Sequence, residues 1–178
     1  MDSLQIKYAV QKISPTNRFF KGCFYNRNIP FNLMMERECF FIVNTITNVR
    51  KMGHWILFYI KNFRLYFFDS FAMSPVEYGW DIDSFFTSYP GYKTEVFQSP
   101  IQNDVSYVCG AYTIFFAHCM CMDYSLFHIK TLFTRNRRRN DSFVVSRVYS
   151  LVGLDIECKS DFCTSLMFFD KCRKYCLC

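Results

Sequence analysis

The chain has 178 residues, the length of one domain, and 51% of them are apolar, with 22 Phe and 12 Tyr. Such a chain can bury a core large enough to offset its ordering entropy, which excludes wholesale disorder. No apolar run approaches the roughly 20 residues that span a bilayer, and the first residues (MDSLQIKYAV) lack the regions of a signal peptide. We therefore expect a soluble intracellular protein with no membrane partner.

Ten cysteines in an intracellular chain of this length indicate reduced thiols, with metal binding or catalysis as alternatives. Five of them form a Cys-rich tail from about residue 158: Cys158, Cys163, Cys172, Cys176 and Cys178. The tail contains no His and matches no strong zinc spacing, and its final CLC resembles a prenylation signal. Unpaired thiols are the prediction there, zinc and lipidation are the alternatives, and no metal or organic cofactor is expected.

The net charge of +6 is unevenly distributed, since Arg135, Arg137, Arg138 and Arg139 fall within one pentapeptide. A basic cluster of this kind favours nucleic acid or another polyanion. A solvated loop is the alternative.

The predicted elements begin with Glu38 to Asn48, an apolar segment that suits a buried helix or a buried strand. His54 to Ile60 and Arg64 to Phe68 are rich in β-branched and aromatic residues, and Lys61 and Asn62 separate them. This pattern predicts an antiparallel hairpin.

Beyond the hairpin, Trp80 to Ser88 is a short amphipathic segment between loops, and Thr94 to Gln98 suits a third strand. Cys109 to Met122 is long, apolar and free of Pro, which predicts a buried helix. Residues 140–142 form a plausible N-cap region for a final helix over Phe143 to Val152. Together these elements predict an α+β fold that forms a single domain over residues 1–178, with a small sheet packed against helices.

Cys109 is the candidate nucleophile, because it would begin the long helix. The positive end of a helix favours thiolate over thiol and lowers the cysteine pKa. Gly110 follows it and allows close backbone approach, and Gln102 lies seven residues upstream in a polar loop. The Gln102 amide is a candidate donor to the oxyanion that forms on a reacting carbonyl.

His54 is the candidate base. It begins the first hairpin strand and Asp69 ends the second, so antiparallel pairing brings them side by side. A carboxylate at Asp69 would accept the second N–H of the imidazole and fix its orientation. The indole of Trp55 would support the imidazolium through a cation–π contact.

The other two histidines are weaker candidates. His118 lies nine residues after Cys109 on the same predicted helix, and at about 100° per residue it falls on the opposite face. We interpret it as a packing residue. His128 lies in a loop-like stretch beyond the helix. Taken singly, Cys109 and His54 would more often be structural than catalytic, and the joint pattern is what favours catalysis.

Several blocks, in order, resemble a known family: FFKGCFYNRNIPFN, ECFFIVNT, GHWILFYI, LYFFDSF, QNDVSYVCGAYTIFFAHC and TRNRRRNDSFVVSRVYSL. They are similar to the adenovirus-type processing cysteine proteases (adenain-like), which share a papain-like architecture with the SUMO and ubiquitin-like deconjugating proteases. The most specific elements are GHW, the Gln102-to-Cys109 spacing followed by Gly110, and the acid after the second strand.

The resemblance implies a triad of His54, Asp69 and Cys109, with Gln102 in the oxyanion hole. It implies a monomeric viral endopeptidase that cleaves capsid and core precursors during virion maturation, in the host nucleus and the virion. It also implies activation by viral DNA, through the arginine cluster, and by a capsid-derived peptide. The family tethers that peptide through a cysteine before the oxyanion Gln, and here that segment (PGYKTEVFQSPI) has none.

Two alternatives remain open. An Asp at position 69 is what the deconjugating proteases have, whereas the adenovirus enzymes mostly have Glu, so a deconjugating protease for SUMO or ubiquitin-like modifiers is one. The other is an inactive, DNA-associated virion protein that keeps the fold.

Overall fold

The computed structural model describes residues 1–46, 53–88 and 91–154. The Cys-rich tail predicted from about residue 158, with its alternatives of zinc binding and lipidation, lies outside the described residues. No helix in the described part of the chain has the length and apolar character that crossing a bilayer requires.

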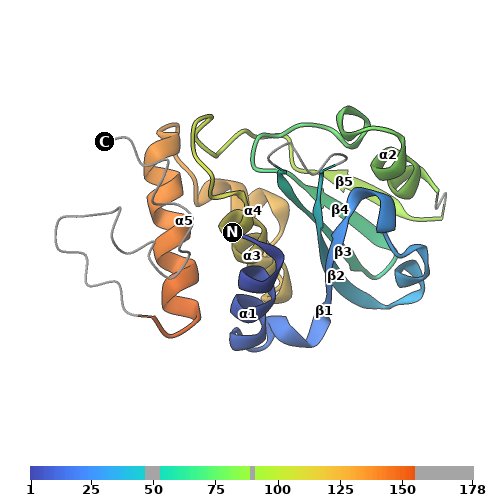
Figure 1. The fold of residues 1–178 in the computed structure, drawn as a ribbon, viewed down its shortest axis with the longest axis horizontal. Helices are drawn as coiled ribbons and strands as arrows, with labels where there is room; N and C mark the ends of the chain where they lie inside the picture. The colour runs from blue at the N-terminus through green and yellow to red at the C-terminus, as the bar shows by residue number, and fades with distance from the viewer. Residues whose placement is uncertain (47–52, 89–90, 155–178) are drawn as a thin grey trace.

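A five-stranded mixed sheet forms the centre of the fold, with its strands in the order in which they occur in the chain (Figure 1). The strands are β1 (Phe20–Tyr25), β2 (Glu38–Asn44), β3 (Trp55–Lys61), β4 (Arg64–Phe68) and β5 (Lys93–Val96). The middle strand, β3, is antiparallel to both of its neighbours, β2 and β4, and each edge strand is parallel to the strand beside it. The predicted hairpin is confirmed, and the ambiguous segment after Glu38 is a strand.

Helices cover both faces of the sheet (Figure 1). One face carries α1 (Ser3–Lys12), α3 (Cys109–Cys121), α4 (Leu126–Thr131) and α5 (Arg137–Leu151), and the other carries α2 (Trp80–Thr87). Four short 3-10 segments connect these elements: Thr16–Phe19, Asn26–Asn28, Phe31–Met35 and Pro75–Tyr78. The predicted α+β class is confirmed.

Burial of both sheet faces explains the continuous apolar runs of the central strands. Along β2, Phe40 and Ile42 face the core that α1, α3 and α5 complete, whereas Phe41 and Val43 face the core that α2 completes. A strand with one solvated face would alternate apolar and polar residues, and this one does not. The same double burial made helix and strand indistinguishable in the sequence.

Two helix predictions were wrong. The final helix begins at Arg137 with Asn136 as its N-cap, six residues before the predicted start at Phe143. Asn140 and Asp141 are buried inside it, where their side chains hold a neighbouring loop. His128 lies in α4, not in a loop.

Candidate active site

The hairpin of β3 and β4 places His54 beside Asp69. His54 directly precedes β3 and Asp69 directly follows β4, and the two strands pair with Leu57 opposite Phe68. The Nε2 atom of His54 lies 2.5 Å from Oδ1 of Asp69. The antiparallel register therefore produces the base–carboxylate contact that the sequence pattern predicts.

Asp69 is fully buried, and four donors surround its carboxylate. Besides His54, Oδ1 accepts the backbone N–H of Phe71 at 3.0 Å. Oδ2 accepts the backbone N–H of Met73 and the hydroxyl of Tyr78, each at 2.8 Å. A buried carboxylate that is hydrogen-bonded in this way is held in one orientation.

Cys109 is the first residue of α3, and the interaction of its thiol with the side chain of His54 lowers the pKa of the thiol and raises that of the imidazole. Because Nε2 of His54 faces Asp69, the remaining ring nitrogen, Nδ1, is the one available to Cys109. The backbone of Trp55 also lowers the pKa of this thiol. The base thus lies between the thiol and the carboxylate.

The electrostatics of the pair favour a thiolate beside an imidazolium. Burial by itself raises the pKa of Cys109, but the hydrogen bond and the charge of His54 outweigh it, and the pKa is lowered. Burial by itself lowers the pKa of His54, but the hydrogen bonds to Asp69 and Cys109 outweigh it and raise that pKa to about 9. A thiolate is the reactive form of cysteine, so this arrangement prepares a nucleophile.

Two aromatic rings contact His54, and neither is the Trp55 indole that the sequence predicts. Phe71 lies with its ring centroid 4.8 Å from the imidazole centroid, and Tyr78 stacks on it at 6.2 Å with an interplanar angle of 18°. Neighbouring residues of an extended strand point to opposite faces, so Trp55 turns away into the core. Its indole N–H donates to the backbone oxygen of Met1. Support of the imidazolium by the Trp55 ring stays a prediction, and the ring contacts that the structure gives His54 come from Phe71 and Tyr78.

Gln102 is buried, at 1% exposure, and its amide is held at both ends. Its Oε1 accepts the hydroxyl of Ser70 at 2.6 Å, and its Nε2 donates to the backbone oxygen of Ser106 at 2.9 Å. A primary amide has two N–H donors, so one remains after the Ser106 contact. Gln102 precedes the loop that leads into Cys109, the place the sequence pattern predicts for an oxyanion donor.

Two glycines allow close approaches around the site. A Cβ at Gly53, just before His54, would collide with the side chain of Asn44. A Cβ at Gly110 would lie 3.1 Å from atoms of Met1, so this glycine makes room for the start of the chain beside α3.

The other two histidines take no part in this constellation. Nδ1 of His118 lies 2.9 Å from Oγ1 of Thr16, a packing contact between α3 and the segment after α1. The ring of His128 stacks on Tyr124 at 4.6 Å.

The arginine cluster lies at the beginning of α5. Arg135, Arg138 and Arg139 are exposed, while Arg137 forms an ion pair of 2.6 Å with Asp104. The positive end of a helix dipole adds to their charge. The cluster therefore presents cations next to the loop that carries Gln102.

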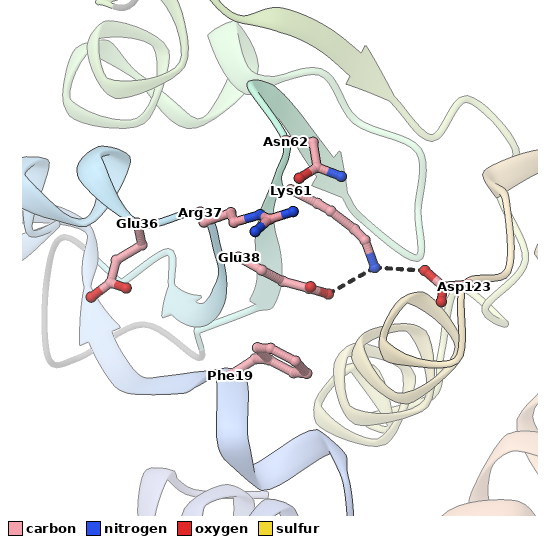
Figure 2. Close-up of a pocket in the computed structure, with 7 residues that line it drawn as sticks. All are labelled: Phe19, Glu36, Arg37, Glu38, Lys61, Asn62 and Asp123. Carbon is pink, nitrogen blue, oxygen red and sulfur yellow. Dashed lines mark hydrogen bonds and ion pairs between the residues drawn. The ribbon is translucent and has the colours of Figure 1, made fainter.

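A surface pocket opens at the opposite end of β3 (Figure 2). Three of its charged side chains are paired with each other, since Nζ of Lys61 lies 2.9 Å from Glu38 and 2.6 Å from Asp123. The pocket contains none of the predicted site residues, because Lys61 lies at the end of β3 that is far from His54.

Sequence reasoning missed three side chains of the site, Ser70, Phe71 and Tyr78. Ser70 had a weak signal, since a polar residue directly after Asp69 at the end of an apolar strand needs a buried partner. Tyr78 had none, because only the fold of the 3-10 segment Pro75–Tyr78 brings its hydroxyl to Asp69.

Comparisons with known proteins give a structural likeness only. No family model and no curated protein sequence matches the chain. A solved structure of the Chlamydia trachomatis effector protein ChlaDUB1 aligns with a TM-score of 0.50 and 16% identity, over 85% of this chain and 72% of that one. A second structure of ChlaDUB1, at 1.7 Å, aligns with a TM-score of 0.47 and 16% identity, over 84% and 77%. The chain thus shares the fold of this effector protein.

Proposed function

We propose that the chain is a cysteine peptidase in which Cys109 is the nucleophile, His54 the general acid and base, and Asp69 the group that orients His54. The observation that carries the proposal is the placement of His54 between the thiol and a buried, fully hydrogen-bonded carboxylate. Structural ion pairs also shift pKa values. Here, however, the shifted groups are a thiol at a helix N-terminus and an imidazole, the pair that thiol catalysis requires.

In the proposed reaction the Cys109 thiolate attacks the carbonyl carbon of the scissile amide. The negative charge on the carbonyl oxygen is stabilised by the free N–H of Gln102 and by the backbone N–H of Cys109, which lies in the first helical turn. The His54 imidazolium gives its proton to the amine as the carbon–nitrogen bond breaks, leaving a thioester. Water then attacks the thioester, His54 takes a proton from that water, and the carbon–sulfur bond breaks to regenerate the thiolate.

Mass spectrometry with an electrophilic peptide and with iodoacetamide tests the peptidase proposal. Wild-type protein is expected to be labelled once, at Cys109, far faster than at its other thiols. The pKa values of Cys23 and Cys119, two matched buried thiols, are raised by burial to about 12, so they should stay unreacted. Equal labelling of Cys109 and these two cysteines, together with no hydrolysis of any peptide, would overturn the proposal.

For the substrate we propose first the C-terminal tail of a ubiquitin-like modifier, cleaved from a conjugate. The shared fold with ChlaDUB1 supports this, because that protein carries the abbreviation for deubiquitinase in its name. Asp69 agrees with this class. Ubiquitin-like probes with a C-terminal electrophile test it: covalent capture by wild type, absent from Cys109→Ala, supports deconjugation.

The second proposed substrate is a viral capsid or core precursor, cut during virion maturation. The ordered sequence blocks, from ECFFIVNT to the arginine-rich segment, support it. On this proposal viral DNA binds the arginine cluster, any peptide activator binds without a disulfide, and the enzyme works as a monomer in the nucleus and virion. Co-expression with candidate precursors tests it, and full processing by Cys109→Ala would refute it.

A further inference from the structure

Asp69 and Ser70 are consecutive residues at the end of β4, yet their side chains serve different halves of the candidate active site. Asp69 contacts His54, whereas the hydroxyl of Ser70 donates to Oε1 of Gln102 at 2.6 Å. Ser70 is fully buried. A buried hydroxyl aimed at a single amide oxygen specifies how that amide is turned.

The backbone of Ser70 holds the same loop. Its carbonyl oxygen accepts the backbone N–H of Ile101 at 3.0 Å and that of Gln102 at 3.1 Å. The backbone contacts fix where Gln102 stands, and the hydroxyl fixes how its side chain is rotated. The two kinds of contact can be separated, because a Ser→Ala substitution removes only the hydroxyl.

The far side of the amide makes the orientation unambiguous. The Ser106 carbonyl can only accept a hydrogen bond, so the Gln102 group facing it at 2.9 Å must be the NH₂. Oε1 then faces Ser70, whose hydroxyl can donate. With Ser70 and Ser106 both engaged, the amide cannot rotate without breaking a buried hydrogen bond.

We propose that Ser70 is a positioning residue that holds the side-chain amide of Gln102 with its free N–H directed at the oxyanion. The inference rests on the proposed peptidase activity and adds to it the residue that orients the oxyanion donor. On this proposal two consecutive residues orient the two halves of the site: Asp69 orients the base His54, and Ser70 orients the oxyanion donor Gln102.

The test compares Ser70→Ala and Gln102→Ala in acyl transfer and in alkylation. Loss of an oxyanion donor lowers kcat by about 10²–10³-fold, so Gln102→Ala is expected in that range and Ser70→Ala at roughly ten- to a hundred-fold, with KM nearly unchanged. Alkylation of Cys109 by iodoacetamide passes through no oxyanion. Its rate should therefore remain at the wild-type value in both variants.

A double variant separates positioning from general structural support. If Ser70 acts through Gln102, Ser70→Ala adds no further loss of kcat in a Gln102→Ala background. Thr113→Val is the matched control, since Thr113 is a buried hydroxyl on α3 that donates to Gly110 and does not touch Gln102. That variant should keep the wild-type kcat.

A measurement that needs no turnover completes the test. In ¹⁵N–¹H spectra the side-chain amide of Gln102 should give two distinct, slowly exchanging proton signals in wild type and in Thr113→Val, and should lose that protection in Ser70→Ala. Unchanged Gln102 signals, or a kcat loss that adds in the double variant, would overturn the role of Ser70. An inactive wild type with a slowly alkylating Cys109 would instead count against the peptidase proposal, while the Gln102 signals still decide the role of Ser70.

Discussion

The hydroxyl of Tyr78 donates to Oδ2 of Asp69 at 2.8 Å, while the same ring stacks on the imidazole of His54 at 6.2 Å. One side chain thus contacts both the base and the carboxylate that orients it. Burial and the adjacent carboxylate raise the pKa of Tyr78, so it stays a neutral donor.

Tyr78→Phe is expected to lower kcat/KM several-fold, because it keeps the stacked ring and removes one of the four donors to Asp69. A hydrogen bond to a charged group contributes roughly 1.5–3 kcal/mol, and three donors remain. Tyr78→Leu removes the ring as well and should cost more. Steady-state kinetics with the best peptide or modifier substrate measures both, and equal activity in all three proteins would show that Tyr78 plays no part.

The pH dependence of kcat/KM is expected to be bell-shaped. The reactive ion pair exists between the lowered pKa of Cys109 and the raised pKa of His54, about 9. Activity should therefore rise as the thiol ionises below its usual range, and fall as His54 loses its proton near pH 9. Rates of iodoacetamide alkylation across the same pH range give the thiolate limb independently. If the rise in activity with pH occurred only above about pH 8.5, where a free cysteine ordinarily ionises, the thiolate–imidazolium pair would be contradicted.

Stability should follow the same ionisation. The folded pKa of His54, about 9, lies above its ordinary value of 6.5. The contribution of protonated His54 to the free energy of unfolding is therefore fully present below about pH 6.5, and it is lost as pH rises through about 9. Urea unfolding of wild type and Cys109→Ala from about pH 6 to about pH 10 checks this. The variant lacks the thiolate partner and should lose less stability over that interval.

Tyr112→Phe is expected to destabilise the fold by about 1–3 kcal/mol, because it removes two buried hydrogen bonds. The Tyr112 hydroxyl contacts the backbone oxygen of Ile101 at 3.1 Å and Asp141 at 2.9 Å, joining α3 and α5 to the loop that carries Gln102. Chemical denaturation measures the change in the free energy of unfolding. Tyr25→Phe, at an exposed position at the end of β1, is the comparison and should change stability by less than about 0.5 kcal/mol.

If the chain binds DNA through the arginine cluster, as the viral proposal requires, replacing Arg138 and Arg139 with Ser should weaken binding to duplex DNA and reduce its salt dependence. Removing one phosphate-binding cation lowers the slope of log affinity against log salt by about 0.9. Lys7 and Lys12, both exposed on α1, provide a matched charge control. An equal weakening by the arginine and the lysine replacements would indicate a general charge effect rather than a DNA site.

Much of the candidate site was predictable because its residues sit at the ends of strongly patterned elements. The alternation of apolar runs and a polar break between Ile60 and Arg64 dictates a hairpin, and a hairpin brings His54 to Asp69 whatever surrounds it. The long apolar run after Cys109 dictates a helix with the cysteine at its positive end. These relations are local, so the sequence by itself determined them.

Contacts between distant segments were decided only by the tertiary structure. Trp55 was a reasonable support for His54 by proximity in sequence, but strand alternation turns it into the core, and Phe71 and Tyr78 meet the imidazole instead. Asn140 resembled a cap because polar residues commonly begin helices, yet packing against Ile101 buries it inside α5. Ser70 reaches Gln102 across 32 positions of chain, a pairing with no local signature. The sequence by itself determined the pairing of base and acid and the position of Cys109 at a helix start, because these relations are local. The packed fold decided that α3 lies against the hairpin and which side chains hold the three residues in place.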